Sequence, residues 1–398
     1  MNRIFDQSKI ELLFYLATSM LFISCSNDDD NGPTQNPEPE IAVVAPEGEV
    51  VFTNTNSLRT RKVTLNLSDG ALVEDSTLDE PQNLLEHQGS VYVIKKGAIS
   101  RQESSGVNTW ERLYPETDFN EFLLLDANFA FGTDALFIQY TQRDLITFES
   151  RYFLEALELS TGITRWIEEL SLDVESFPFI IGNRLLLTPR NSFDPIRYYN
   201  LQTGVVEADN SYTDRVDPGR FVDVNGTIIA SSWNNRILAL DANLDIAWTF
   251  DTRETNAIKG ILFDEQFIFP SRDETLYSLN QSSGDLNWET PLPNRLTLGL
   301  HESQGQIYLF QPKIDAPPEL LTINPENGMI TDTFSIDTGT TSIDDIRAAF
   351  FQEFMIVMSS INDTENTVQL IHLPTAETVW EITADNTGFG TTIKVNSN

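Results

Sequence analysis

The sequence contains few of the residues that build reactive sites. It has one cysteine, so no disulfide can form within the chain. Its three histidines, His87, His301 and His372, have no metal-ligand spacing, and we expect them to be structural. Its 25 Lys and Arg stand against 60 Asp and Glu, which excludes nucleic-acid binding through the phosphates. Nucleophile-elbow and phosphate-loop motifs are missing too, so we expect a non-enzyme with no cofactor and no metal.

Long apolar runs are also scarce, and the clearest lies at residues 12–23, just before Ser24 and Cys25. Its length is typical of a secretory signal peptide and short for a membrane span. With the stretch "FISC" it resembles the signal of bacterial lipoproteins, in which the cysteine is acylated and becomes the mature N-terminus. The resemblance implies a signal peptide over residues 1–24 and lipidation of Cys25. The alternative is a secreted protein with an unmodified cysteine.

The stretch "SNDDDN" that follows Cys25 resembles the acidic export tag of surface lipoproteins in Bacteroidetes. This resemblance implies an outer-membrane location with exposure at the cell surface, while a periplasmic-facing protein is the alternative. Residues 25–47 are polar, acidic and rich in proline, a composition that predicts a flexible tether rather than a folded element.

Past residue 47 the chain repeats one unit. Alternating apolar runs such as "QIYLF" (306–310) predict strands, and no segment predicts a long amphipathic helix. Each unit carries a polar turn after its third run. The turn positions align as Gly70, Gly106, Gly162, Gly204, Leu244, Gly284, Gly328 and Ala376. The 306 positions from the first to the last, divided by seven intervals, give about 44 residues per unit, which is the size of a four-stranded propeller blade.

A tryptophan follows the turn by four positions in most units. These tryptophans are Trp110, Trp166, Trp248, Trp288 and Trp380, and the position is lost at Glu74, Ala208 and Asp332. Glycine supplies the positive φ that a tight hairpin needs. A tryptophan in the outer strand can then bury its ring between adjacent blades.

These units predict an all-β, eight-bladed β-propeller over residues 48–398, with seven blades as the alternative. Each blade has four antiparallel strands. The first unit shows only three strands, and a further strand occurs at the C-terminal end of the chain. We therefore expect residues 391–395 to complete the first blade and to close the ring, which removes exposed sheet edges.

Three stretches, "LELSTGITRW" (157–166), "LALDANLDIAW" (238–248) and "YSLNQSSGDLNW" (277–288), resemble the repeat of the pyrroloquinoline-quinone-like eight-bladed propellers. That superfamily includes quinoprotein alcohol dehydrogenases and BamB-like lipoproteins. The quinoprotein enzymes need a bound quinone, a calcium site and often a disulfide between adjacent cysteines, and no residues here match their cofactor site. The BamB-like resemblance implies a protein-interaction scaffold at the outer membrane. A quinone-dependent dehydrogenase is the remote alternative.

The loops between the second and third strands of each unit share one face, and their lengths vary. Loops 141–152, 189–198, 311–319 and 359–367 are long, whereas 231–236 and 270–275 are short. Variable loops on a rigid scaffold usually mark a binding face. The candidate residues are Arg143, Phe148, Arg190, Phe193, Arg197, Trp233, Asn234, Arg236, Arg272 and Lys313.

These loops are richer in Lys and Arg than the rest of the chain. We weigh two interpretations: a basic mouth for an anionic partner, or bases that pair with acids on neighbouring loops. Trp233, beside Asn234 and Arg236, suits contact with a sugar or peptide, or else packs over the central channel. We expect a monomeric propeller whose partner is a protein or a glycan.

Overall fold

The computed structural model describes residues 43–55, 60–78, 82–103, 106–114, 120–170, 178–188, 195–212, 216–232, 234–254, 260–294, 297–313, 315–340, 346–362, 365–385 and 392–397. One compact unit runs from Val43 to Asn398, and its described residues contain strands but no helix. Val43 and Ala45, near the end of the predicted tether, already pack against this unit. Cys25 and the predicted signal peptide lie outside the described residues.

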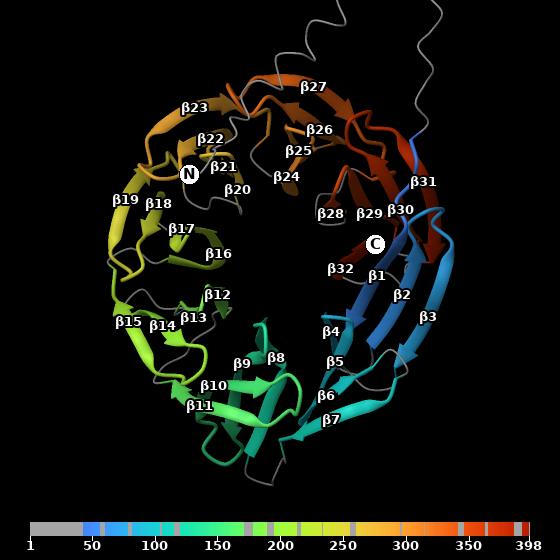
Figure 1. The fold of residues 1–398 in the computed structure, drawn as a ribbon. Helices are drawn as coiled ribbons and strands as arrows, with labels where there is room; N and C mark the ends of the chain where they lie inside the picture. The colour runs from blue at the N-terminus through green and yellow to red at the C-terminus, as the bar shows by residue number, and fades with distance from the viewer. Residues whose placement is uncertain are drawn as a thin grey trace, which may run out of the picture. The chain divides into compact units, whose positions relative to one another are not determined.

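The strands form eight antiparallel sheets of four, set as blades around a ring (Figure 1). This confirms eight blades rather than seven. The first four blades contain β32 (Thr392–Ser397), β1 (Gly48–Thr55), β2 (Thr60–Asn66) and β3 (Leu72–Leu78); β4 (Gln82–His87), β5 (Ser90–Lys95), β6 (Ala98–Gln102) and β7 (Asn108–Leu113); β8 (Asn120–Phe131), β9 (Ala135–Asp144), β10 (Ser150–Glu158) and β11 (Thr164–Leu170); β12 (Phe179–Ile181), β13 (Arg184–Leu187), β14 (Ile196–Asn200) and β15 (Val206–Asn210).

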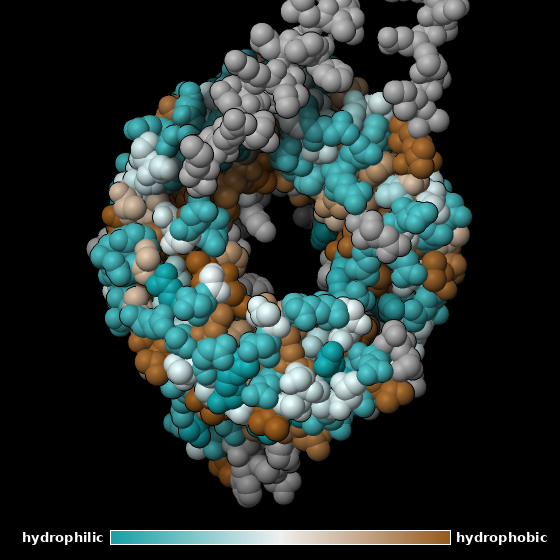
Figure 2. Space-filling view, viewed as in Figure 1, coloured by the Kyte–Doolittle hydropathy of each residue, from teal (hydrophilic) through white to brown (hydrophobic). Residues whose placement is uncertain are grey.

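Blades 5 to 8 follow the same order, from the inner strand to the outer strand. They contain β16 (Val216–Val224), β17 (Thr227–Ser232), β18 (Arg236–Leu240) and β19 (Ile246–Asp251); β20 (Ile261–Phe263), β21 (Gln266–Ser271), β22 (Thr275–Asn280) and β23 (Leu286–Pro291); β24 (Gly299–Ser303), β25 (Gln306–Lys313), β26 (Ala316–Ile323) and β27 (Ile330–Ser335); β28 (Ile346–Phe351), β29 (Phe354–Asn362), β30 (Glu365–His372) and β31 (Thr378–Asp385). Figure 2 shows the ring hollowed at its centre.

The two ends of the described chain share blade 1. Strand β32 pairs antiparallel with β1, and the register places Val395 opposite Val50 and Ile393 opposite Phe52. The predicted closing strand is therefore confirmed, although it extends two residues further, to Ser397. Closure gives the inner edge of β1 a hydrogen-bonding partner, so the sheet of blade 1 is complete.

The hydrophobic core lies between blades rather than within one layer. Successive residues of a strand face opposite sides, so both faces of each sheet are buried. In β22, for example, Leu276 joins the cluster that blades 6 and 7 share, while Tyr277 joins the cluster between blades 5 and 6. Seven such clusters are described, one at each blade interface except that between blades 1 and 2.

All eight aligned turn positions adopt a left-handed backbone, with φ between 55° and 79°, including the non-glycine residues Leu244 and Ala376. The tryptophan of each such blade packs onto the turn of the next blade. A Cβ on Gly162 would lie 2.5 Å from the ring of Trp110. The indole N–H of each tryptophan also donates to the carbonyl oxygen three residues before the next turn, at distances of 2.7–3.2 Å.

The interface between blades 4 and 5 reverses this size pattern. Ala208 stands at the tryptophan position, and Leu244, fully buried, stands at the glycine position. The side chain of Asn210 donates a 3.0 Å hydrogen bond to the carbonyl oxygen of Leu244. A large residue on the turn thus fills the space that a tryptophan fills at other interfaces.

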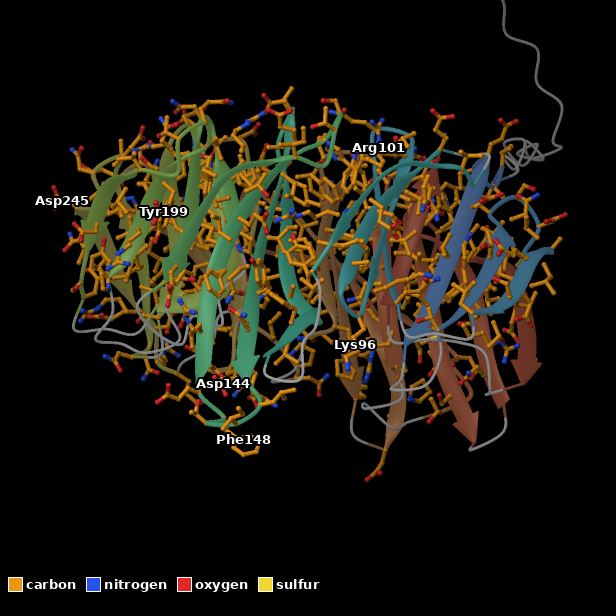
Figure 3. All side chains as sticks on the ribbon, turned by 90° about the horizontal axis from the view of Figure 1, so that it is seen from below. Lys96, Arg101, Asp144, Phe148, Tyr199 and Asp245 are labelled. Atoms are coloured by element: carbon orange, nitrogen blue, oxygen red, sulfur yellow. The ribbon has the colours of Figure 1, made fainter. Side chains whose placement is uncertain are left out.

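The turns between second and third strands share one face of the ring, which we call the hairpin face. Figure 3 shows Lys96, Asp144 and Phe148 on this side, with Arg101 and Asp245 toward the opposite side. The prediction of long loops there is wrong in three blades, where β9 and β10, β25 and β26, and β29 and β30 continue as paired strands. The backbone ladder of these hairpins continues through polar residues, some of which, such as Gln311 and Asn366, are buried.

Candidate functional site

The hairpins of blades 3, 7 and 8 lengthen the hairpin face, and the hairpin of blade 3 exposes apolar side chains at its tip. Strand β9 reaches Asp144 and β10 begins at Ser150, with Arg143 paired to Ser150 across the hairpin. In Figure 3 the tip, labelled at Phe148, projects beyond Lys96 in the turn of the neighbouring blade. Five residues, 145–149, form this tip.

The backbone of the tip is held by one carboxylate. Asp144 Oδ1 accepts hydrogen bonds from the backbone N–H groups of Ile146 and Thr147, at 2.7 and 2.8 Å. These bonds lower the pKa of Asp144. The backbone N–H of Phe148 donates to the carbonyl oxygen of Asp144 at 2.9 Å, and Phe148 has φ of 59°. The tip is therefore a defined turn rather than an open loop.

Apolar side chains cover this tip. Leu145 is 39% exposed, Ile146 63% and Phe148 73%. Phe148 is the only exposed aromatic among the side chains that the structure describes. Sequence analysis identified Phe148 but missed Leu145 and Ile146, although the apolar run in "DLITF" between two charged residues was a usable signal.

Five basic residues of the hairpin face, within the described ranges, have acidic partners. The two atoms of each pair lie within 2.9 Å for Arg61 with Asp75, Lys62 with Glu74, Arg151 with Glu169 and Arg236 with Asp251, and Lys313 pairs with Glu319. Hydrogen bonds from Arg61, Lys62 and Arg151 lower the pKa of Asp75, Glu74 and Glu169. This pairing reduces the positive charge that the face presents.

The other candidate residues are dispersed around the ring. Arg143 and Arg272 are exposed and form no ion pair within the described ranges. Asn234 is exposed in the turn of blade 5, and Arg197 is half-buried on β14. Arg190, Phe193 and Trp233 lie outside the described residues. The structure thus gathers Arg143 with Phe148 but brings no other pair of described candidates into one blade except Asn234 and Arg236.

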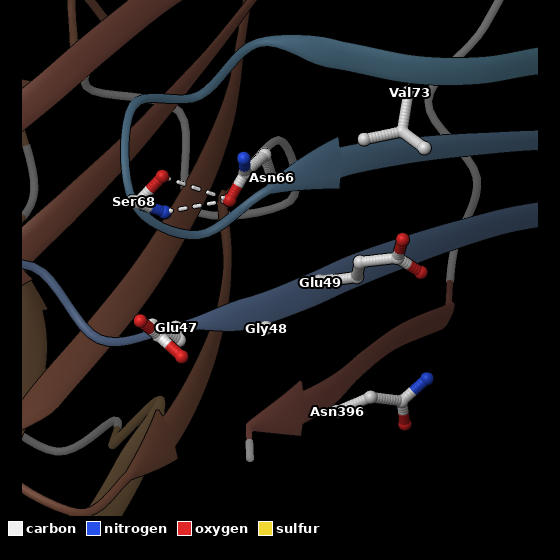
Figure 4. Close-up of a pocket in the computed structure, with 7 residues that line it drawn as sticks. All are labelled: Glu47, Gly48, Glu49, Asn66, Ser68, Val73 and Asn396. Carbon is white, nitrogen blue, oxygen red and sulfur yellow. Dashed lines mark hydrogen bonds between the residues drawn. The ribbon is translucent and has the colours of Figure 1, made fainter.

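The opposite face carries acidic cavities. One, of about 560 Å³, lies on blade 1 and is lined by Glu47, Glu49, Asn66 and Asn396 among others (Figure 4). Asn66 Oδ1 there accepts hydrogen bonds from the backbone N–H and the hydroxyl of Ser68, both at 3.0 Å. A second cavity, of about 690 Å³ on blade 6, is lined by Asp264 and Glu265 among others. Such carboxylate-rich hollows attract cations and repel anions.

A buried carboxylate between blades 2 and 3 was not identified from the sequence. Glu155 is fully buried and accepts hydrogen bonds from Tyr114 at 2.8 Å and from Thr164 at 2.5 Å, with Arg112 at 3.4 Å. Burial, with the charge of Glu155 beside the hydroxyls, raises the pKa of Tyr114 and Tyr140. The partners satisfy the carboxylate, so the cluster joins two blades and offers no free acid or base.

Nowhere in the described ranges do three His, Cys, Asp or Glu side chains come close enough to hold a metal ion. The histidines lie apart: His87 stacks on Phe131, and His301 bonds the Gln352 carbonyl at 2.7 Å. No helix in the described part of the chain has the length and hydrophobicity to cross a membrane.

Comparisons with known proteins identify the fold. No family model matches the chain, and no curated protein matches it. Among solved structures, BamB from Moraxella catarrhalis is 12% identical, with 80% of this chain and 97% of that chain covered and a TM-score of 0.50. A europium-containing methanol dehydrogenase is 10% identical, covers 78% of both chains and has a TM-score of 0.53. Apo AztD from Citrobacter koseri is 12% identical, with 88% of this chain and 98% of that chain covered and a TM-score of 0.52. These likenesses support a propeller of the PQQ-like and BamB-like kind, and at such identities they show the fold alone.

Proposed function

We propose that this protein is a non-catalytic scaffold that binds another protein through the hairpin face and is held at the outer membrane by a lipid on Cys25. The similarity to the fold of BamB is compatible with a scaffold, although one propeller fold serves enzymes and binding proteins alike.

One observation carries the proposal. The blades repeat the same four-stranded sheet and the same turn conformation, whereas the hairpins of blades 3, 7 and 8 extend the hairpin face. A rigid frame with elaborations confined to one face is the arrangement in which binding residues commonly lie. Blade 3 adds an exposed apolar tip to this face.

Affinity purification from detergent-solubilised envelope, using the full chain, tests the scaffold. We expect a protein that co-purifies in stoichiometric amount and that is lost when the tips of the three extended hairpins are replaced by short glycine turns. If the co-purifying protein still binds that variant, its contact does not lie on the extended hairpins. Labelling with an alkyne fatty acid tests the anchor: incorporation in the wild type and in Cys25→Ser alike would exclude acylation of that cysteine.

The second candidate is a surface lipoprotein that binds a glycan or another anionic ligand at the same face. It is favoured by Arg143 and Arg272, which are exposed and outside the described ion pairs. A glycan array separates the two candidates, because a signal that disappears in Trp233→Ala or Arg272→Ala supports the glycan. Absorbance of a bound quinone in the purified protein would instead support the remote alternative, a dehydrogenase.

A further inference from the structure

The blade 3 tip is shaped as a contact element rather than as a connection. A two-residue turn is enough to join adjacent antiparallel strands, as Lys96 and Gly97 do in blade 2. Blade 3 instead extends β9 and β10 and closes them with five residues. The extension carries Leu145, Ile146 and Phe148 away from the packed core, so core packing does not account for them.

The backbone conformation of the tip is also fixed by hydrogen bonds within the tip itself. Asp144 binds two backbone N–H groups through one carboxylate oxygen, and its own backbone N–H donates to the Glu149 carbonyl oxygen at 2.9 Å. Phe148 holds a φ of 59°, a region that bulky residues rarely adopt. A fixed backbone with an exposed aromatic side chain lowers the ordering cost of binding, as expected for an anchor residue at a protein interface.

The charges around the tip favour one kind of partner. Asp144 and Glu149 flank the apolar side chains, against the single cation Arg143, while Arg151 is held by Glu169 at 2.6 Å. Insertion into a bilayer would carry both carboxylates toward the lipid, and the net charge of −35 opposes approach to anionic lipid or to a second copy. An apolar pocket with a basic rim on another protein complements both the side chains and the charge.

We propose that the blade 3 tip is the anchor of the protein interface, with Phe148 and Ile146 inserted into an apolar, basic-rimmed pocket of the partner. This rests on the proposed scaffold function and names its contact element. It also specifies how association responds to salt: because the partner's rim is basic, binding weakens as ionic strength rises.

Site-specific photocrosslinking in the native envelope tests the proposal. The probe is p-benzoylphenylalanine, placed singly at Phe148, at Arg272 on the same face, and at Ile163, which is 64% exposed in a turn of the opposite face. We expect one protein to be crosslinked from position 148 and none from position 163. That protein, once purified, should bind the full chain with a Kd raised at least tenfold by Phe148→Asp and by Ile146→Asp, but unchanged by Ile163→Asp.

A folding defect is separated from a binding defect by Phe148→Gly. Glycine accepts the positive φ, so this variant should keep or raise the melting temperature and still lose binding at least tenfold. A lipid adduct, a crosslink to a second copy, or no adduct at position 148 would overturn the proposal. If a protein is crosslinked at 272 but not at 148, the tip is not the anchor and the scaffold stands. If no position on the hairpin face captures a protein, the scaffold fails as well.

Discussion

The indole Nε1 of Trp110 donates a 2.8 Å hydrogen bond to the backbone carbonyl oxygen of Leu159, in the turn of the next blade. The same ring lies over Gly162, which leaves no room for a Cβ. The tryptophan and the glycine of one repeat therefore serve two different interfaces: the glycine receives the ring of the preceding blade, and the tryptophan covers the turn of the following one. Each repeat is coupled to both neighbours.

This arrangement predicts that Gly162→Ala is markedly more destabilising than Gly106→Ala. Both glycines have a positive φ, which costs an alanine roughly 1–2 kcal/mol. Only at Gly162 would the new Cβ also lie 2.5 Å from an indole ring, which adds about 1–3 kcal/mol of overpacking. Urea unfolding of the two variants measures the difference, and equal midpoints would show that the ring yields without cost.

The reversed pair between blades 4 and 5 predicts coupling between two substitutions. Ala208→Trp alone inserts a ring where buried Leu244 already packs, and Leu244→Gly alone leaves a cavity. Together they rebuild the glycine–tryptophan arrangement of the other interfaces. In a double-mutant cycle we expect the double variant to be about 1–3 kcal/mol more stable than the sum of its single changes. If the stability changes of the two single variants simply add, the two side chains do not compete for the same space.

The ring of repeated blades could be predicted from the sequence because its turn positions accept few residue types. A tight turn with positive φ selects glycine, and a fixed period makes the substitutes Leu244 and Ala376 recognisable by their position. Counting strands in the first unit was enough to assign the closing strand. The compensation of Ala208 by Leu244 could not be seen, because it depends on which side chains meet across an interface.

The hairpin face was less predictable. The largely polar sequence of residues 141–152 is compatible with either a loop or a strand pair, and only the pairing register decides between them. Ion pairs such as Arg236 with Asp251 likewise depend on cross-strand register, which a single sequence does not contain. Exposure of Leu145 and Ile146 follows from the same hairpin. Cys25, Arg190, Phe193 and Trp233 fall outside the described residues, so their roles stay predictions.

Removal of the closing strand should destabilise the whole ring. Truncation after Asp385 deletes β32 and uncovers the edge of β1, where Ile393 and Val395 pack against the cluster of blades 8 and 1. Loss of two apolar side chains costs about 3–6 kcal/mol if they are fully buried, and less here because they are half-exposed. Calorimetry should show a melting temperature several degrees lower. A melting temperature equal to that of the intact chain would show that closure contributes nothing.

The ion pairs at the outer edge of blade 1 predict a pH-dependent stability difference. Hydrogen bonds from Arg61 and Lys62 lower the pKa of Asp75 and Glu74. Their stabilisation is therefore present above the ordinary carboxyl pKa near 4 and is lost as the pH falls through the lowered, folded-state values. Arg61→Met should lower the free energy of unfolding at pH 7 by up to about 1 kcal/mol in urea titrations, and this difference should shrink as the pH falls toward 2. A difference that persists at pH 2 would point to lost packing instead.

The interface between blades 1 and 2 is the one without a hydrophobic cluster among the described residues. Blade 1 has Glu74 where a tryptophan would stand, and a Cβ on the facing Gly106 would meet no described atom within 4 Å beyond its own chain neighbours. Polar contacts cross this interface: Thr60 exchanges two 2.8 Å hydrogen bonds with the backbone of Gln82, and Glu86 binds Lys394 at 3.0 Å. The uncovered turn at Gly106, which faces Glu74, leaves room for a tryptophan ring of the kind found at the other interfaces.

Glu74→Trp should therefore stabilise the protein. The ring would cover the open turn at Gly106 and bury apolar area worth about 1–2 kcal/mol, against the small cost of releasing Lys62 from its exposed ion pair. Asp332→Trp is the matched control, because Ala376 already places a methyl group on the facing turn. We expect the urea midpoint to rise in Glu74→Trp with an unchanged slope and to fall or stay level in Asp332→Trp. A lower midpoint in Glu74→Trp would mean that blades 1 and 2 stand too far apart for an indole to bridge, and that the polar contacts alone set their spacing.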